Sequence, residues 1–78
     1  MVQSRRVPVS IRAVLARLNR KLATENRRVV VARPGSVQER ELGRYYLVHG
    51  NVVKDSHLEI EAFARRVGVL SDLERLTE

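Results

Sequence analysis

The chain contains no cysteine and no tryptophan, and its only aromatic residues are Tyr45, Tyr46 and Phe63. Without cysteine, disulfide bonds and thiolate-ligated zinc sites are excluded. The two histidines, His49 and His57, have no acidic cluster at ligand spacing beside them, so we expect no closed metal site and no cofactor. The chain also lacks a glycine-rich phosphate loop and any nucleotide-binding fingerprint.

Long hydrophobic runs are missing as well. No stretch approaches the roughly 20 apolar residues that are needed to span a bilayer. The charged residues that follow Met1 lead into no hydrophobic signal region. We therefore expect a cytoplasmic protein that makes no membrane contact.

Small size limits the hydrophobic core. The 78 residues make one domain at most, and a core of this size rarely supplies more than about 3–5 kcal/mol of stability. Disulfides are excluded and no closed metal site is expected, so oligomerisation is the remaining way to enlarge the core. Because a closed two-fold dimer is the commonest assembly, we expect a homodimer.

Acidic residues are scarce in the first half of the chain. Residues 1–40 hold ten arginines and lysines against two acids, a net charge of +8, whereas residues 41–78 hold five against seven, a net of −2. Most of the excess is arginine, whose planar guanidinium suits phosphate. This asymmetry favours a phosphate-bearing partner over a basic surface kept only for solubility.

The clearest predicted element is a helix over residues 11–25, which follows Ser10 as its N-cap. Its apolar residues recur at the spacing of one helix face and are Ile11, Val14, Leu15, Leu18 and Leu22. The opposite face carries Arg12, Arg17, Arg20 and Lys21. Like charges four residues apart repel, so an acidic partner would stabilise this helix.

Strands are predicted next. The β-branched and aromatic runs at residues 28–33 and 42–48 favour strand, and residues 52–54 form a third strand that closes a hairpin across His49, Gly50 and Asn51. Pro34-Gly35-Ser36 breaks the first strand, and the polar stretch that follows, to Glu41, has no period, so it predicts a mobile loop.

A second helix is expected from His57 or Leu58 to Val67. Ser56 and Glu59 fit a capping box before it, and Gly68 takes the place of a left-handed C-terminal residue. Ser71 and Glu74 repeat the capping signature and predict a final short helical turn.

The expected fold is therefore α+β, with the order α-β-β-β-α. A small three-stranded antiparallel sheet packs with two helices, in a chain that forms a homodimer. Residues 10–78 make up this single domain, and residues 1–9 form a basic, partly flexible N-terminal arm.

No group of residues predicts catalysis. His49 beside a turn and His57 at a helix start are interpreted as surface residues. Glu59 and Glu61, two residues apart, do not face together on a helix, and Glu61 is placed to pair with Arg65 instead. We expect no enzymatic activity and no small-molecule substrate.

Residues 61–71 also match the first helix and turn of a helix-turn-helix, with Ala64 as the small residue and Gly68 in the turn. The segment that would then enter the major groove, residues 71–78, is short and mainly acidic in its charges, so phosphate would repel it. An ordinary amphipathic helix ended by glycine is the better interpretation.

Cations of the first helix, the arm and the first strand form the candidate nucleic-acid surface. They are Arg5, Arg6, Arg12, Arg17, Arg20, Lys21, Arg27, Arg28 and Arg33. No base-reading set can be named, so we expect phosphate contacts with modest sequence preference; the alternative is a solvated cationic face. Tyr45 and Tyr46 point to opposite faces of their strand, where packing is favoured over stacking on an unpaired base.

Several segments share a pattern with known sequences: residues 7–13, 17–22, 42–48, 58–59 and 68–70, which read VPVSIRA, RLNRKL, LGRYYLV, LE and GVL. Together they resemble a family of small proteins carried on plasmids and integrative elements of proteobacteria, whose members are mostly of unassigned function. The resemblance implies an accessory protein of a mobile element, for which DNA binding or regulation is expected.

The sequence thus predicts a small dimeric DNA-binding protein that contacts the phosphates of duplex DNA through the arginines of its first helix. The alternative is a protein-interaction module, an antitoxin-like or adaptor dimer whose basic face binds an acidic protein. A third possibility is binding of RNA or single-stranded DNA through a tyrosine.

Overall fold

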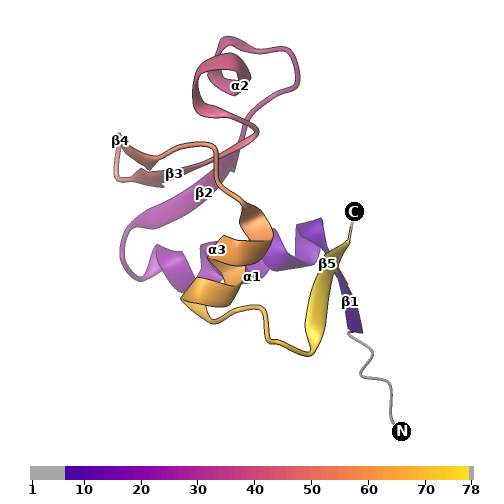
Figure 1. Ribbon diagram of the computed structural model, residues 1–78. Coiled ribbons are helices and arrows are strands. Elements are labelled where there is room, and N and C mark those ends of the chain that lie inside the picture. Colours follow the sequence, from indigo (N-terminus) through magenta and orange to yellow (C-terminus); the bar gives the residue numbers. More distant parts are fainter. Residues whose placement is uncertain (1–6, 78) are drawn as a thin grey trace, which may run out of the picture.

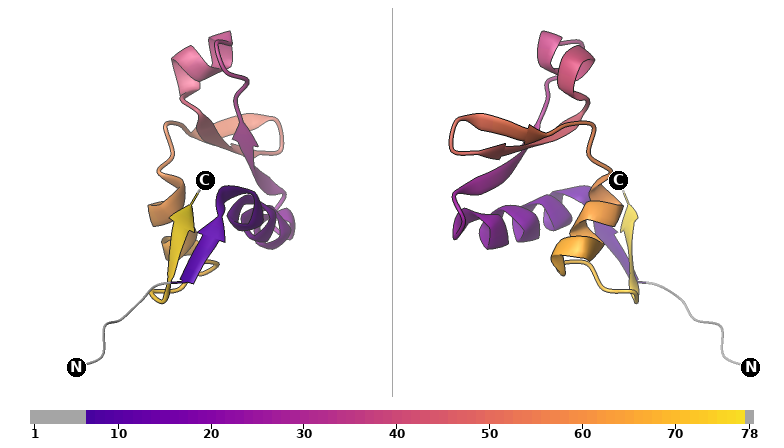
Figure 2. Two further views of the ribbon diagram at one scale, coloured as in Figure 1. Left: turned by 90° about the vertical axis from the view of Figure 1, so that its right-hand side faces the viewer. Right: turned by 60° about the vertical axis from the view of Figure 1, so that its left-hand side comes forward.

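The computed structural model describes residues 7–77 and forms an α+β fold. Helix α1 lies along the base of the molecule, with a three-stranded sheet above it and α3 across one side (Figures 1 and 2). A short parallel strand pair lies beyond α3, and α2 lies at the opposite end, above the sheet. The elements are β1 (Val7–Ser10), α1 (Ile11–Ala23), β2 (Arg27–Val31), α2 (Val37–Leu42), β3 (Tyr45–His49), β4 (Val52–Asp55), α3 (Ile60–Val67) and β5 (Glu74–Thr77).

Helix α1 begins where the sequence predicts. Ser10 is its N-cap, and its hydroxyl oxygen accepts a hydrogen bond of 3.1 Å from the backbone N–H of Ala13. The helix ends at Ala23, two residues earlier than expected. Its predicted apolar face is the one that packs inward: Val14, Leu18 and Leu22 are buried, and Ile11 and Leu15 pack at the edge of the core.

The three-stranded antiparallel sheet is confirmed, with the strand order β2-β3-β4. Val29 lies opposite Leu47 across β2 and β3, and both side chains are buried against α1 and α3. The pairing of β3 with β4 shifts between Leu47 and Val48, which leaves Lys54 as an extra residue in β4.

The predicted loop between β2 and β3 is wrong, because this segment holds helix α2. Ser36 caps it by accepting a 3.1 Å hydrogen bond from the N–H of Glu39, and the Glu39 carboxylate accepts one of 2.7 Å from the N–H of Gly35. These reciprocal bonds form a helix start without apolar periodicity, since no residue of α2 is buried. The Ser36–Glu39 spacing, typical of a capping box, indicated this helix in the sequence, but the polar composition of the segment favoured a loop.

Helix α3 starts at Ile60, later than predicted, and Ser56 does not cap it; Glu59 stands at the N-cap without a side-chain hydrogen bond. The residues before α3 do not cap the helix; they bond to the end of α2 and the start of β3 instead. His57 has a left-handed φ of 52° and donates its backbone N–H to the Leu42 carbonyl at 2.7 Å, so the segment crosses back over the start of β3. The predicted end is confirmed, since Gly68 has φ 95° and closes the helix onto Ala64.

The expected helical tail is also wrong. Ser71 and Glu74 do form a turn, in which the Glu74 carboxylate accepts from the N–H of Ser71 at 3.1 Å. The chain then extends as β5, which pairs in parallel with β1 in a register that joins Val7 to Glu74 and Ser10 to Thr77. Residues 7–9, expected at the end of a flexible arm, therefore lie in a strand, while residues 1–6 lie outside the described part.

The chain after α3 is not the second helix of a helix-turn-helix. A helix-turn-helix would need a second helix after Gly68, and the described residues there form a turn and a strand. The Glu61–Arg65 ion pair is confirmed, with 3.3 Å between the carboxylate and guanidinium. Within residues 7–77, no helix has the length and apolar character needed to cross a membrane.

The core lies between α1, α3 and the sheet. Val14 and Leu18 of α1 are fully buried at its centre, and no polar side chain among the described residues is buried with them. The other buried members are Val9, Leu22, Val29, Leu47, Ile60, Phe63, Ala64 and Leu70. This packing fixes which face of α1 is left to solvent.

Candidate nucleic-acid interface

The solvent face of α1 carries arginines but no acid. Arg12 and Arg20 are exposed, with the small residues Ala13 and Ala16 between them. The guanidinium of neither arginine has an ion-pair or hydrogen-bond partner among residues 7–77. At 1.5 Å per residue, they are separated by about 12 Å along the helix axis. They therefore present two free guanidinium groups on one exposed face.

Arg17 and Lys21 belong to the side of α1 that meets α3 and the chain after it. Arg17 donates to the Glu74 carboxylate at 3.1 Å and to the Val69 carbonyl at 3.0 Å. The Lys21 ammonium donates to the carbonyl of Val67 at 2.8 Å, in the last turn of α3. A cation at the C-terminal end of a helix interacts favourably with the helix dipole. Both residues brace the fold as well as adding positive charge.

The Glu74 carboxylate is held in its ionised form. The backbone N–H of Ser71 is the main cause that lowers the pKa of Glu74, and the hydrogen bond from Arg17 lowers it further. This carboxylate links the start of β5 to α1, and it also reduces the free charge of Arg17 available to an anionic partner.

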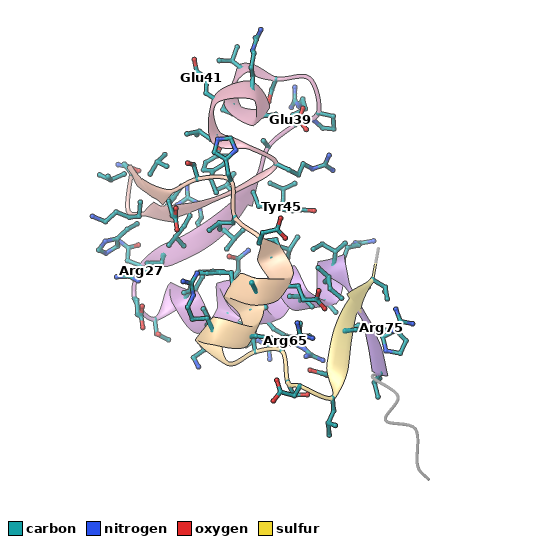
Figure 3. All side chains as sticks on the ribbon, viewed as in Figure 1. Arg27, Glu39, Glu41, Tyr45, Arg65 and Arg75 are labelled. Carbon is teal, nitrogen blue, oxygen red and sulfur yellow. The ribbon has the colours of Figure 1, made fainter. Side chains whose placement is uncertain are left out.

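Arg27 and Arg28 line a hollow where α1 leads into β2. The hollow has a volume of about 220 Å³ and is also lined by Asn19, Ala23 and Asn26. Figure 3 places Arg27 at this end of the molecule, opposite the end where Arg75 lies on β5. The two asparagines were not among the predicted site residues. The Asn26-Arg27-Arg28 run directly after the helix is the signal that points to them.

The remaining predicted cations lie apart from this group. Arg33 is exposed beyond the end of β2, next to Pro34, and its guanidinium has no partner among the described residues. Arg5 and Arg6 lie outside the described residues. Arg12, Arg20, Arg27 and Arg28 are thus spread along α1 and its junction with β2, with Arg17 and Lys21 on the other flank of the helix.

The two tyrosines are half-buried, and Tyr45 packs against the core beneath β3. A second cavity, of about 320 Å³, lies beside Tyr45 and the start of α3. Glu59, Glu61 and Arg44 line it, so two acids face one cation and phosphate is favoured less there than in the hollow beside Arg27. Among residues 7–77 no group of three or more histidines and acids could hold a metal ion.

Comparisons with protein-family models, with curated proteins and with solved structures find no match for this chain. The chemistry of the surface itself therefore carries the functional argument.

Proposed function

We propose that this protein binds duplex DNA through its phosphates, as a small accessory or regulatory factor of a mobile element in the cytoplasm. The observation that carries the proposal is the acid-free solvent face of α1, where Arg12 and Arg20 are exposed and unpaired within residues 7–77. Guanidinium groups that are free of internal partners can each neutralise a phosphate and release its counterion.

The charge of the rest of the molecule supports this choice of face. Two of the acids, Glu39 and Glu41, are on α2, at the far end of the molecule from α1 (Figure 3). The acid nearest the arginines in sequence is Glu25, whose carboxylate lies 3.7 Å from the Arg27 guanidinium. The field along α1 is therefore positive, which steers a polyanion toward it.

The proposal includes a homodimer, and β4 is the strand we assign to its interface. All four residues of β4 are exposed, and its outer edge forms no hydrogen bond with residues 7–77. Val52 and Val53 are 58% and 43% exposed there. Pairing of two β4 strands would cover these valines and double the number of phosphate contacts.

The test compares two double variants with the same loss of charge. Arg12→Ala/Arg20→Ala removes the free arginines of α1, and Arg40→Ala/Arg75→Ala removes two exposed arginines from α2 and β5. In an anisotropy titration with a random duplex at about 50 mM salt, the first variant should bind at least about tenfold more weakly than the second. Equal affinity of the two would contradict the assigned face.

Capture of an acidic protein is the second candidate. The exposed arginines of α1 favour it as well, because a guanidinium pairs with the carboxylates of an acidic protein as it does with phosphate. Duplex DNA separates the two candidates: a protein-binding module would leave an unrelated duplex unbound at low salt. Single-stranded DNA of the same length tests the third possibility, and stronger binding to it would favour stacking on a tyrosine.

A further inference from the structure

We infer that the hollow at the junction of α1 and β2 is a subsite for one phosphate group. The inference rests on the proposed function, since it specifies where the backbone of a nucleic acid is gripped. Five residues line the hollow, and those with polar side chains are Asn19, Asn26, Arg27 and Arg28. No acidic residue among residues 7–77 lines it.

An unsatisfied donor marks the site. The Nε atom of Arg27 is buried, and its N–H has no acceptor among residues 7–77. The side chain as a whole is 41% exposed, so the guanidinium reaches from the buried Nε to solvent. The exposed Nη groups are the donors that a phosphate in the hollow reaches first, and a small rotation of the guanidinium would add Nε–H to form the fork that binds two phosphate oxygens.

Glu25 does not satisfy this fork. Its carboxylate is 3.7 Å from Nη1 of Arg27, which is an ion pair beyond hydrogen-bond distance. The Glu25 side chain is 59% exposed and can move away from an incoming anion. It acts as a competitor for Arg27 that a phosphate displaces.

Two further donors surround the hollow. The guanidinium of Arg28 makes a single long contact, 3.4 Å to the Gly50 carbonyl, and keeps other N–H groups available. The side-chain amide of Asn26 has no partner among residues 7–77, and its backbone is fixed with φ 59° at the turn. Asn19 forms the wall, since its amide is already bonded to Val29.

The position of the hollow fits a backbone that follows α1. At 100° per residue, Arg12, Asn19 and Ala23 fall within about 40° of one another around the helix. About 16 Å of helix axis separates Arg12 from Ala23. A nucleic-acid strand that follows this side of α1 would contact Arg12 and would place one of its next phosphates beside Arg27.

The experiment is an NMR titration of the full chain with inorganic phosphate, at constant ionic strength held with chloride. The Nε–H signal of Arg27 and the side-chain amide of Asn26 should shift and saturate, and the Nε–H signal of Arg75 should not. Arg27→Lys keeps the charge but removes the fork, and should weaken phosphate binding at least about tenfold. Arg75→Lys is the matched control and should leave it unchanged.

Glu25→Gln keeps the test decisive if Arg27→Lys unfolds, and it should tighten phosphate binding by removing the competitor. Uniform small shifts across all arginines, or no effect of Glu25→Gln, would overturn the subsite. A duplex-DNA titration of the same samples separates the two claims. DNA binding that leaves Arg27 and Asn26 unshifted overturns the subsite alone; saturable phosphate binding without DNA binding supports the subsite for free phosphate and overturns the proposed function.

Discussion

The side chain of Asn19 on α1 pairs with the backbone of Val29 on β2. Its Oδ1 accepts the N–H of Val29 at 2.7 Å, and its Nδ2 donates to the carbonyl of the same residue at 3.4 Å. An amide in this position hydrogen-bonds to β2 as a neighbouring strand would. The same side chain lines the hollow beside Arg27. Asn19 therefore contributes both to the stability of this sheet edge and to the shape of the proposed subsite.

A second strand edge is covered in a similar way. Glu61 of α3 accepts the N–H of Leu76 at 3.0 Å, and Arg65 donates to the carbonyl of Glu74 at 2.7 Å. The ion pair of Glu61 with Arg65 thus covers the outer edge of β5. Strand edges left open invite pairing with another chain. In residues 7–77 such side-chain cover is missing from β4, which is why the proposed dimer uses that strand.

Asn19→Ala should destabilise the protein. It removes two hydrogen bonds and leaves the backbone of Val29 without partners, at a cost of about 1–3 kcal/mol. Gln38→Ala on α2 is the control, because that side chain is exposed and forms no hydrogen bond within residues 7–77, and it should cost less than about 0.5 kcal/mol. Urea unfolding followed by circular dichroism measures both, and equal midpoints would show that the Asn19 pairing contributes nothing.

Gly43→Ala should be more destabilising than Gly35→Ala. Gly43 has φ 82° and ψ 179°, a conformation almost restricted to glycine, and an added Cβ would lie 2.7 Å from Nδ1 and 2.9 Å from Cα of His57. Strain and this clash together should cost about 3 kcal/mol or more. Gly35 has φ 79° and nothing within 4 Å of an added Cβ, so only the backbone cost of about 1–2 kcal/mol applies.

Thermal melts of the two glycine variants rank them directly. A Gly43→Ala protein as stable as Gly35→Ala would contradict the close approach of the crossing segment to the end of α2.

The elements with a clear apolar pattern could be predicted from the sequence, because each one follows a single local rule. The i, i+3 and i+4 spacing in residues 11–22 identified the buried face of α1, and Gly68 marked the end of α3. The valines of β2 and the aliphatic run of β3 form strands as expected. These elements bury their own side chains, so local pattern and tertiary packing agree.

The missed elements depend on distant partners or on polar bonds. Strands β1 and β5 are four residues each and become strands only by pairing across nearly the whole length of the chain. Helix α2 is held by the bonds of Ser36 and Glu39 instead of a buried face. At the candidate site, the charge of α1 was predictable, but the internal bonds of Arg17 and Lys21 depend on where α3 ends.

Glu74→Gln should reduce the acid sensitivity of the fold. The pKa of Glu74 is lower in the folded chain than its ordinary value of 4.5, because the N–H of Ser71 and then Arg17 stabilise the carboxylate. Stability from this group is therefore fully present above the ordinary pKa and is lost as pH falls through the folded pKa. Between about pH 5 and pH 2.5, the melting temperature of the wild type should fall more than that of the variant.

Glu41→Gln is the control for this comparison, since that exposed acid on α2 forms no ion pair within residues 7–77. Parallel pH profiles for the wild type and Glu74→Gln would show that the Ser71 and Arg17 contacts do not stabilise the carboxylate.

Val53→Lys should weaken the proposed dimer. The substitution places a cation on each β4 strand, so two protomers would bring like charges together across the interface. Val37→Lys adds the same charge on α2, where the valine is 53% exposed against 43% for Val53, and should leave the dimer intact. Light scattering after size exclusion measures the mass. A wild-type chain that stays monomeric at about 100 μM, far above the Kd of a stable dimer, would refute the assembly.

The salt dependence of duplex binding tests the central claim most directly. With Arg12, Arg20, Arg27 and Arg28 each neutralising one phosphate, a plot of log K against log salt concentration should have a slope of about −4 per protomer and about −7 for a dimer. The Arg12→Ala/Arg20→Ala variant should lose about 2 of this slope per protomer. Absence of binding at about 50 mM salt, or a slope near zero, would contradict a phosphate-binding surface on α1.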